Sequence, residues 1–300
     1  MRSGSILARA VALAVCAMLL IAQAGCFASG RVTLATLDSP ESILVGEIIA
    51  LQLEDFGFEV VRGHRYQSVA DLEAGMRAGE FDLTALFIQD ALTGFGVINE
   101  SPLFDQILVE EIVNNTIRDM FGYMLLDQWN LLGARYTIAM RDVEQGRRLG
   151  FDVLSRYAPS LSIAVTSGFL EGTGGLAHMR EIFGELEFSD ITVINATDIY
   201  NMGWLDVDVI ALREYMMGSW LLDAGYAPID SGISIWPNNI LYPIAKEDVI
   251  ERRPEIRAVL SSTAFHIDTA MFAERLHAIS QGRQTTTEAA YEILQARNRF

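Results

Sequence analysis

The stretch RVTLATLDSPESILVGEIIALQLEDFGFEVVR, residues 31–62, decides the fold class. Residues 31–37 have the apolar pattern of a strand, and residues 40–56 have the apolar spacing of a helix that Ser39 caps. After a glycine, residues 58–62 give a second strand. A strand, a helix and another strand in this order form the repeating unit of a parallel α/β sheet.

The same alternation continues outward from this unit. A second helix is predicted over 68–78, where Ser68 supplies an N-cap, and the apolar run FDLTALF over 81–87 is a third, buried strand. Downstream, the pattern predicts helices over 106–126, 179–183 and most of 247–300, and strands over 135–140, 162–166, 191–194, 207–212 and 240–245.

Two α/β sets joined by two strand crossings predict two lobes that share a hinge. The first lobe is expected to comprise residues 31–137 and 238–300, and the second lobe residues 138–237. In open α/β sheets, ligands bind where loops and helix N-termini meet at the carboxyl ends of the strands. We therefore expect a ligand between the two lobes.

The first 25 residues have the pattern of a secretory signal peptide. Arg2 and Arg9 precede an uncharged apolar run over 10–24, AVALAVCAMLLIAQA, which is short for a membrane span. A cluster of small residues follows the run at once, and this favours export over an anchor helix or a buried core helix.

Two cleavage chemistries fit the end of this signal. The Ala22-Gln23-Ala24 triplet satisfies the small-x-small rule of ordinary signal peptidase, whereas Ala24-Gly25-Cys26 is similar to the end of a bacterial lipobox. Cys26 would be the single cysteine of the exported chain, which excludes a disulfide within it. We favour lipid attachment at Cys26, and a periplasmic or other extracytoplasmic location in either case.

The chain is acidic, with a formal net charge of −17 over 300 residues. Such a surface repels nucleic acid and anionic lipid head groups. We therefore expect no nucleic-acid partner, and contact with a membrane only through an N-terminal lipid.

Five segments occur in the order and at the spacing of one known family. They are LDSPE with the helix after it (from 37), AGEFDL (78–83), WNLLGARYTIAM (129–140), DVDV (206–209) and WPNNILYP (236–243). They resemble the osmoprotectant-binding proteins of ABC transporters, which bind glycine betaine, choline or carnitine. The resemblance spans nearly the whole chain after the signal.

This resemblance implies a type II periplasmic-binding-protein fold, in which two lobes close on a small solute. It also implies a function, the delivery of a quaternary-ammonium zwitterion similar to glycine betaine to the permease of an ABC transporter. A protein of this kind carries no cofactor or metal and is not an enzyme.

A quaternary ammonium has no hydrogen-bond donor, so proteins bind it through the faces of aromatic rings. The aromatic candidates lie at strand ends and crossings, where a ligand is expected, and core packing is the alternative role for each. They are Phe87, Tyr136, Tyr215 and Trp236, with Tyr200 and Trp204 in reserve.

A ligand carboxylate needs a fork of donors or a helix N-terminus. Ser39 and Glu41 belong to a polar loop at the start of the first long helix, and Arg213 and Arg135 could each add a guanidinium. The alternatives are simple helix capping for Ser39, and for the arginines an ion pair with an acid such as Glu214. A carboxylate-bearing ligand would favour glycine betaine over choline.

Three departures from the family pattern leave the ligand open. Phe87–Asp90 replaces a Tyr-Thr-Gly-Thr motif, Arg213–Met216 replaces Tyr-Ser-Thr-Asp, and Trp236–Asn238 replaces Pro-Pro-Tyr. An amino acid or another zwitterion is therefore the second candidate ligand.

An enzyme of the same topology, such as one similar to porphobilinogen deaminase, is the alternative from another class. The sequence offers it no recognisable catalytic set, because the four histidines are scattered and no metal-ligand spacing occurs. The glycine-rich segment 169–175 lacks the Lys-Ser/Thr of a phosphate-binding loop, and we expect it to be a flexible loop that faces the cleft.

Overall fold

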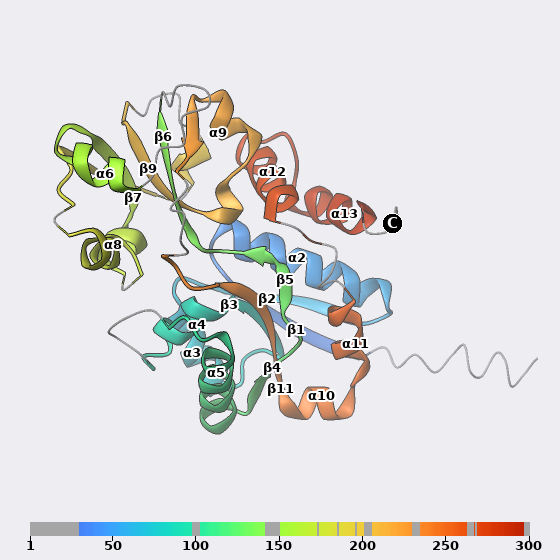
Figure 1. The fold of residues 1–300 in the computed structure, drawn as a ribbon. Coiled ribbons are helices and arrows are strands. Elements are labelled where there is room, and N and C mark those ends of the chain that lie inside the picture. The colour runs from blue at the N-terminus through green and yellow to red at the C-terminus, as the bar shows by residue number, and fades with distance from the viewer. Residues whose placement is uncertain are drawn as a thin grey trace, which may run out of the picture.

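A computed structural model describes residues 30–97, 103–141, 151–172, 174–184, 186–195, 197–200, 206–229, 235–262, 267 and 269–296. The strands form two sheets with helices packed around them, and the chain crosses between the sheets twice (Figure 1). We call the part built on the first sheet the first lobe and the part built on the second sheet the second lobe. The two-lobed α/β fold class predicted from the sequence is confirmed.

The first sheet grows from the strand–helix–strand unit that the sequence predicts. Its first three strands pair in parallel, with the first strand between the other two. The second strand continues four residues past its predicted end at 62. The elements are β1 (Arg31–Leu37), α2 (Pro40–Asp55), β2 (Glu59–Tyr66), α3 (Val69–Ala78) and β3 (Leu83–Phe87).

The two predicted helix caps behave differently. The Ser68 hydroxyl accepts a hydrogen bond from the Asp71 amide at 3.1 Å, which is an ordinary N-cap of α3. Ser39 occupies the N-cap position of α2 with an extended backbone, but its side chain makes no cap hydrogen bond. Its hydroxyl donates instead to the carboxylate of Glu41 at 2.7 Å.

The returning strand completes the first sheet from the far end of the chain. β11 (Ile240–Lys246) runs antiparallel to β3 on one side, and β4 (Tyr123–Leu125) and β5 (Trp129–Gly133) pair with its other side. The strand order is therefore β2-β1-β3-β11-β4, with the returning strand between the third and fourth strands.

The helix predicted over 106–126 is too long by five residues. α5 (Gln106–Phe121) ends where Gly122 adopts a left-handed backbone with φ of 71°, a conformation that glycine reaches without strain. The residues after Gly122 are β4, which pairs with β11. The pairing available in the folded sheet overrides the local helical pattern.

The second sheet has a mixed topology with the order β10-β6-β9-β7-β8. Its β7 is parallel to both β8 and β9, whereas β6 is antiparallel to β9 and to β10. The strands are β6 (Tyr136–Arg141), β7 (Ser162–Thr166), β8 (Asp190–Ile194), β9 (Val209–Arg213) and β10 (Tyr226–Pro228).

Two segments predicted as loops contain regular structure. The segment 169–175 begins inside α7 (Ser167–Glu171), which follows β7 directly and packs against α8 (Leu176–Phe183). The segment 223–239 contains β10, which pairs with β6. Both elements are short, and tertiary contacts rather than local periodicity determine them.

The chain crosses between the lobes at two adjacent places. The first crossing, residues 134–135, connects β5 to β6, and the second, residues 236–239, leads into β11. The amide of Ala134 donates to the carbonyl oxygen of Asn239 at 2.8 Å, so a backbone hydrogen bond joins the two crossings.

The C-terminal helices pack against both lobes. α13 (Thr286–Ala296) lies along α2, and α12 (Thr269–Ser280) contacts both α2 and the short turn Glu214–Met216 at the end of β9 (Figure 1). Because α12 touches both lobes, its contacts do not assign the C-terminal residues to one lobe. The lobe boundaries at 137 and 238 stay a prediction. Among the described residues, no helix combines the length and the apolar character that a membrane span needs.

Trp129 of β5 is a main packing residue against α11 (Glu255–Ser261). Its side chain is fully buried, and its indole N–H donates to the carbonyl oxygen of Leu260 at 3.2 Å. We expect Trp129→Ala to lower the free energy of unfolding by about 3–5 kcal/mol, because it leaves a cavity and an unpaired carbonyl. Urea denaturation measures this, and the exposed Leu222→Ala is the control, with a change within about 0.5 kcal/mol. A Trp129→Ala loss below about 1 kcal/mol would contradict the packing role.

Candidate ligand-binding site

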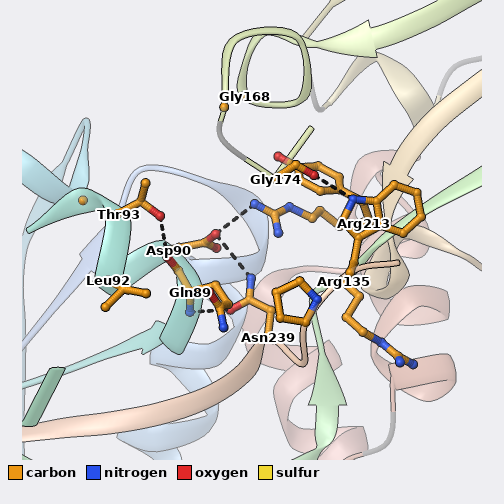
Figure 2. A pocket seen from close by; sticks show the side chains of 14 residues that line it. Gln89, Asp90, Leu92, Thr93, Arg135, Gly168, Gly174, Arg213 and Asn239 are labelled. Carbon is orange, nitrogen blue, oxygen red and sulfur yellow. Dashed lines mark hydrogen bonds and ion pairs between the residues drawn. The ribbon is translucent and has the colours of Figure 1, made fainter. Parts of the chain in front are cut away.

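A cavity of about 360 Å³ lies between the two lobes beside the crossings (Figure 2). Gln89 and Asp90 line it from the first lobe, and Tyr136 and Arg213 line it from the second lobe. Trp236 and Asn239 of the second crossing, together with several glycines, complete the wall. The volume lies at the small end of the range for small-molecule pockets.

The end of β3 positions the acidic side of the cavity. The chain passes from β3 directly into α4 (Ile88–Gly94), so Gln89 and Asp90 stand at the carboxyl end of a buried strand. The Gln89 amide donates to the side-chain oxygen of Asn239 at 2.8 Å. This bond turns the Asn239 side-chain nitrogen towards Asp90, to which it donates at 3.3 Å.

Arg213, at the end of β9, supplies the positive charge of the cavity. One of its terminal nitrogens donates to Asp90 at 2.9 Å and the other to the carbonyl oxygen of Ala134 at 2.7 Å. The guanidinium carbon lies 3.9 Å from the centre of the Tyr136 ring, which faces Arg213 across the paired strands. Burial lowers the pKa of Arg213, but the charge and hydrogen bond of Asp90 together with the nearby Tyr136 and Tyr215 outweigh this, and the pKa is raised overall.

Two of the predicted aromatic residues reach the cavity. The edge of Tyr136 meets the ring of Phe169 at 4.9 Å and that of Trp236 at 6.3 Å between centroids. The Trp236 indole N–H donates to the carbonyl oxygen of Gly174 at 2.6 Å. Trp236 is also 92% buried in the core of the second lobe, as its exposed fraction of 8% shows, so it both packs and lines the cavity.

The glycine-rich segment faces the cleft as predicted. Gly172 and Gly174 of this segment and Gly168 just before it line the cavity, and they present backbone there instead of side chains. Figure 2 shows Gly168 and Gly174 on the opposite side of Arg213 from Asn239.

The other predicted ligand contacts do not line this cavity. Phe87 stacks on Tyr215 with ring centroids 5.5 Å apart, and both are at least 93% buried, with exposed fractions of 7% and 5%. Ser39 and Glu41 lie beside Tyr215, which is also close enough to Arg213 and Asp90 to interact with both charges. The predicted aromatic set is thus divided between the cavity and an adjoining buried group, and ligand contact by Phe87, Tyr215, Ser39 and Glu41 stays a prediction.

This buried group, which includes Glu41, Tyr215, Tyr200 and Phe87, lies where α2 of the first lobe meets the second lobe. Burial raises the pKa of Glu41, although hydrogen bonds from Ser39 and Tyr215 act in the opposite direction. Burial also raises the pKa of Tyr215 and of Tyr200, and the nearby Glu41 charge adds to it. The interface therefore raises the pKa of Glu41 overall.

The two arginines proposed as partners of a ligand carboxylate form ion pairs with different acids in this structure. Arg135 also lines the cavity, but its guanidinium donates to Glu214 at 2.6 Å and points away from Asp90 (Figure 2). An ion pair with Glu214 is the alternative that the sequence suggested for it. Arg213 pairs instead with Asp90, which the sequence analysis did not select.

Sequence reasoning also missed Asn239 and Gln89. The signal for Asp90 and Gln89 was available, because both follow a predicted buried strand in a motif that departs from the family pattern. Trp204 and Cys26 lie outside the described residues. Within the residues that the structure describes, no group of three or more histidine, cysteine or acidic side chains could hold a metal ion.

No protein-family model matches the sequence, and no curated protein matches it. Solved structures do match. A glycine betaine/carnitine/choline ABC transporter protein has a TM-score of 0.72 at 13% identity, over 89% of this chain and 98% of its own. The fold is that of the type II solute-binding proteins. Apo YehZ from Escherichia coli has a TM-score of 0.68 at 16% identity, over 88% of this chain and 98% of its own. Lactococcal OpuAC, in a closed form complexed with glycine betaine, has a TM-score of 0.56 at 12% identity, over 90% of this chain and 97% of its own.

The raised pKa of Glu41 predicts a pH-dependent effect on stability. Ionisation of Glu41 opposes folding above the pKa that it has when unfolded, so this penalty is present at neutral pH and absent in acid. We expect Glu41→Gln to raise the melting temperature by about 2–4 °C at pH 7.5, and this gain to vanish near pH 4.

Glu47→Gln is the matched control on the same helix. Burial raises the pKa of Glu47, but hydrogen bonds from Arg62 at 2.7 Å and Thr287 at 2.9 Å outweigh this and lower it overall. This carboxylate stabilises the fold above its unfolded pKa, and the stabilisation is lost as the pH falls through the lowered value. The control should therefore lower the melting temperature at pH 7.5. Equal signs for the two variants in a calorimetric pH series would contradict the assignment.

Proposed function

We propose that the protein binds a small zwitterion outside the cytoplasmic membrane and delivers it to the permease of an ABC transporter. The observation that carries this proposal is the presence of Arg213 and Asp90 beside the ring of Tyr136 in one cavity between two lobes. A zwitterion carries the two charges that complement this pair. The structural neighbours include transport proteins for glycine betaine, choline or carnitine, and they support the same class of solute.

In this proposal, Arg213 binds the carboxylate of the solute. Its planar guanidinium can present two parallel N–H donors to a carboxylate, and the stacked Tyr136 ring and the Ala134 carbonyl fix its orientation. The two terminal nitrogens now contact different oxygens, so a bound carboxylate would take the place of Asp90 at one of them.

The cationic end of the solute then lies beside Asp90. The rings of Tyr136 and Trp236 line the same cavity and can attract a quaternary ammonium, which has no N–H to donate. We favour a solute similar to glycine betaine. Its carboxylate can pair with Arg213, and its methylated cation can be bound by the negative charge of Asp90 and the aromatic rings without any hydrogen bond. Choline lacks the carboxylate.

An amino acid is the second candidate, and one observation favours it. The cation side of the cavity holds polar acceptors, namely the Asp90 carboxylate and the side-chain oxygen of Asn239, which accepts from the Gln89 backbone N–H. A primary ammonium would donate hydrogen bonds to such oxygens, whereas a quaternary ammonium would not. The two candidates share the charge arrangement and differ only in the donors on nitrogen.

In this role the protein is a transport component and not an enzyme, and it needs no cofactor. Binding and release follow from closure and opening of the two lobes about the crossings. The N-terminal sequence supports export, and Cys26 is the proposed site of a lipid that would hold the protein at the membrane. Its partners would be the solute and the permease.

Calorimetric titration with glycine betaine, choline and proline tests the proposed ligand. We expect glycine betaine to bind more tightly than choline, because choline leaves Arg213 without a carboxylate. Arg213→Ala should weaken glycine betaine binding at least tenfold, about 1.4 kcal/mol, and should reduce the preference over choline.

Arg135→Ala is the matched control, since Arg135 lines the same cavity but pairs with Glu214. This variant should keep the preference for glycine betaine. Tighter binding of choline by the unaltered protein, or an unchanged preference in Arg213→Ala, would reject the assignment of Arg213. Tighter binding of proline than of glycine betaine would favour the amino-acid alternative.

Mass spectrometry of the membrane fraction tests the anchor. We expect a diacylglyceryl group on Cys26, motivated by the Ala24-Gly25-Cys26 triplet and by the absence of another cysteine after the signal. An exported chain that begins at Gly25 with an unmodified cysteine would reject lipidation and leave export intact.

A further inference from the structure

We propose that the Asp90–Arg213 ion pair is a latch that holds the two lobes together when no solute is bound. The latch deepens the proposed function, because a solute that enters the same cavity has to displace it. Its own existence does not depend on the identity of the solute.

The two charges come from opposite lobes. Asp90 belongs to α4, which continues from β3 of the first sheet, whereas Arg213 ends β9 of the second sheet. Their contact of 2.9 Å therefore joins the lobes directly across the cavity (Figure 2). The pair formed by Arg135 and Glu214 joins the first crossing to the turn after β9, so it does not link the first sheet to the second sheet.

Four residues close this contact into a ring of hydrogen bonds. Arg213 donates to Asp90 and to the Ala134 carbonyl, and Asn239 donates to Asp90. The Ala134 amide donates to the Asn239 carbonyl and completes the ring. Because Ala134 and Asn239 belong to the two crossings, the latch is bonded to both chain segments about which the lobes would move.

The pair also neutralises the cavity in the absence of a solute. An unpaired guanidinium and an unpaired carboxylate, both partly withdrawn from water, would each favour an open, hydrated cleft. Here the side chains of Arg213 and Asp90 retain exposed fractions of only 20% and 34%, and each satisfies the other. The lobes can thus close on each other without leaving either charge unpaired.

Opening the latch selects solutes by charge. A zwitterion can replace both partners, with its carboxylate at Arg213 and its cation at Asp90. A solute with a single charge replaces one partner and leaves the other unpaired in a poorly hydrated cavity, which is unfavourable. Charge selection would then arise from the cost of breaking the latch as well as from contacts with the solute.

Distance measurement between the lobes tests the latch without any solute. Spin labels on cysteines placed at Ile107 and Ile182, both exposed, report the separation of α5 in the first lobe from α8 in the second. The protein is exported with Cys26→Ser and freed of bound solute by unfolding and refolding. Pulsed electron resonance then gives the populations of short and long distances.

We expect Asp90→Asn to lower the ratio of short to long distances by about threefold, the effect of one partly exposed ion pair. High salt should lower the same ratio in the unaltered protein and should have little effect in Asp90→Asn, because only the former contains the pair. Glu214→Gln, which breaks the Arg135 pair, is the matched control and should keep the original distances.

Distances that are identical in the unaltered protein and in Asp90→Asn, and insensitive to salt in both, would overturn the latch. If Asp90→Asn fails to fold, the salt series on the unaltered protein decides alone, and insensitivity rejects the latch. A latch that is found while no zwitterion binds would reject the proposed function and leave this inference standing.

Discussion

The pairing of β11 with β3 is the constraint on which the rest of the structure depends. These strands lie more than 150 residues apart in the chain, and their antiparallel register places Leu241 opposite Phe87. This register brings Asn239, just before β11, next to Gln89, just after β3. The second crossing, the acidic end of the cavity and the backbone bond between the crossings all follow from this one pairing. A shift of one residue would reverse the faces of β11 and separate these groups.

Most of the fold could be predicted because its strongest signals are local. The strand, helix and strand over 31–62 carry their own apolar pattern, cap position and terminating glycine, and the structure reproduces them closely. The missed elements, such as β4 and β10, have three residues each. Strands of this length have no measurable periodicity, and they exist because a partner strand offers them hydrogen bonds. Such partners cannot be read from a single sequence.

The candidate site was predictable only in part, for a different physical reason. Strand ends and crossings pointed to Tyr136, Arg213 and Trp236, which line the cavity, and also to Phe87 and Tyr215, which stack on each other beside it. Sequence position tells which edge of a sheet a residue occupies, whereas the rotation of its side chain depends on neighbours from the other lobe. The partner of Arg213 was missed for the same reason, since Asp90 is 123 residues away.

In this cavity the residues that would recognise charge are different from the residues that would limit the size of the solute. In the proposed function, charge recognition rests on Asp90 and Arg213, whereas the wall at Gly168, Gly172 and Gly174 is backbone. A Cβ atom added at Gly174 would meet no atom within 4 Å, and one at Gly168 would only touch the Tyr136 hydroxyl at 3.7 Å. The length of the accepted molecule can therefore change through a single side chain at Gly168 or Gly174, while Asp90 and Arg213 stay as they are; at Gly172 a Cβ would meet the Gly168 carbonyl oxygen at 2.3 Å. A lineage built on this scaffold could move between larger and smaller solutes of one charge type by steps that leave the fold intact.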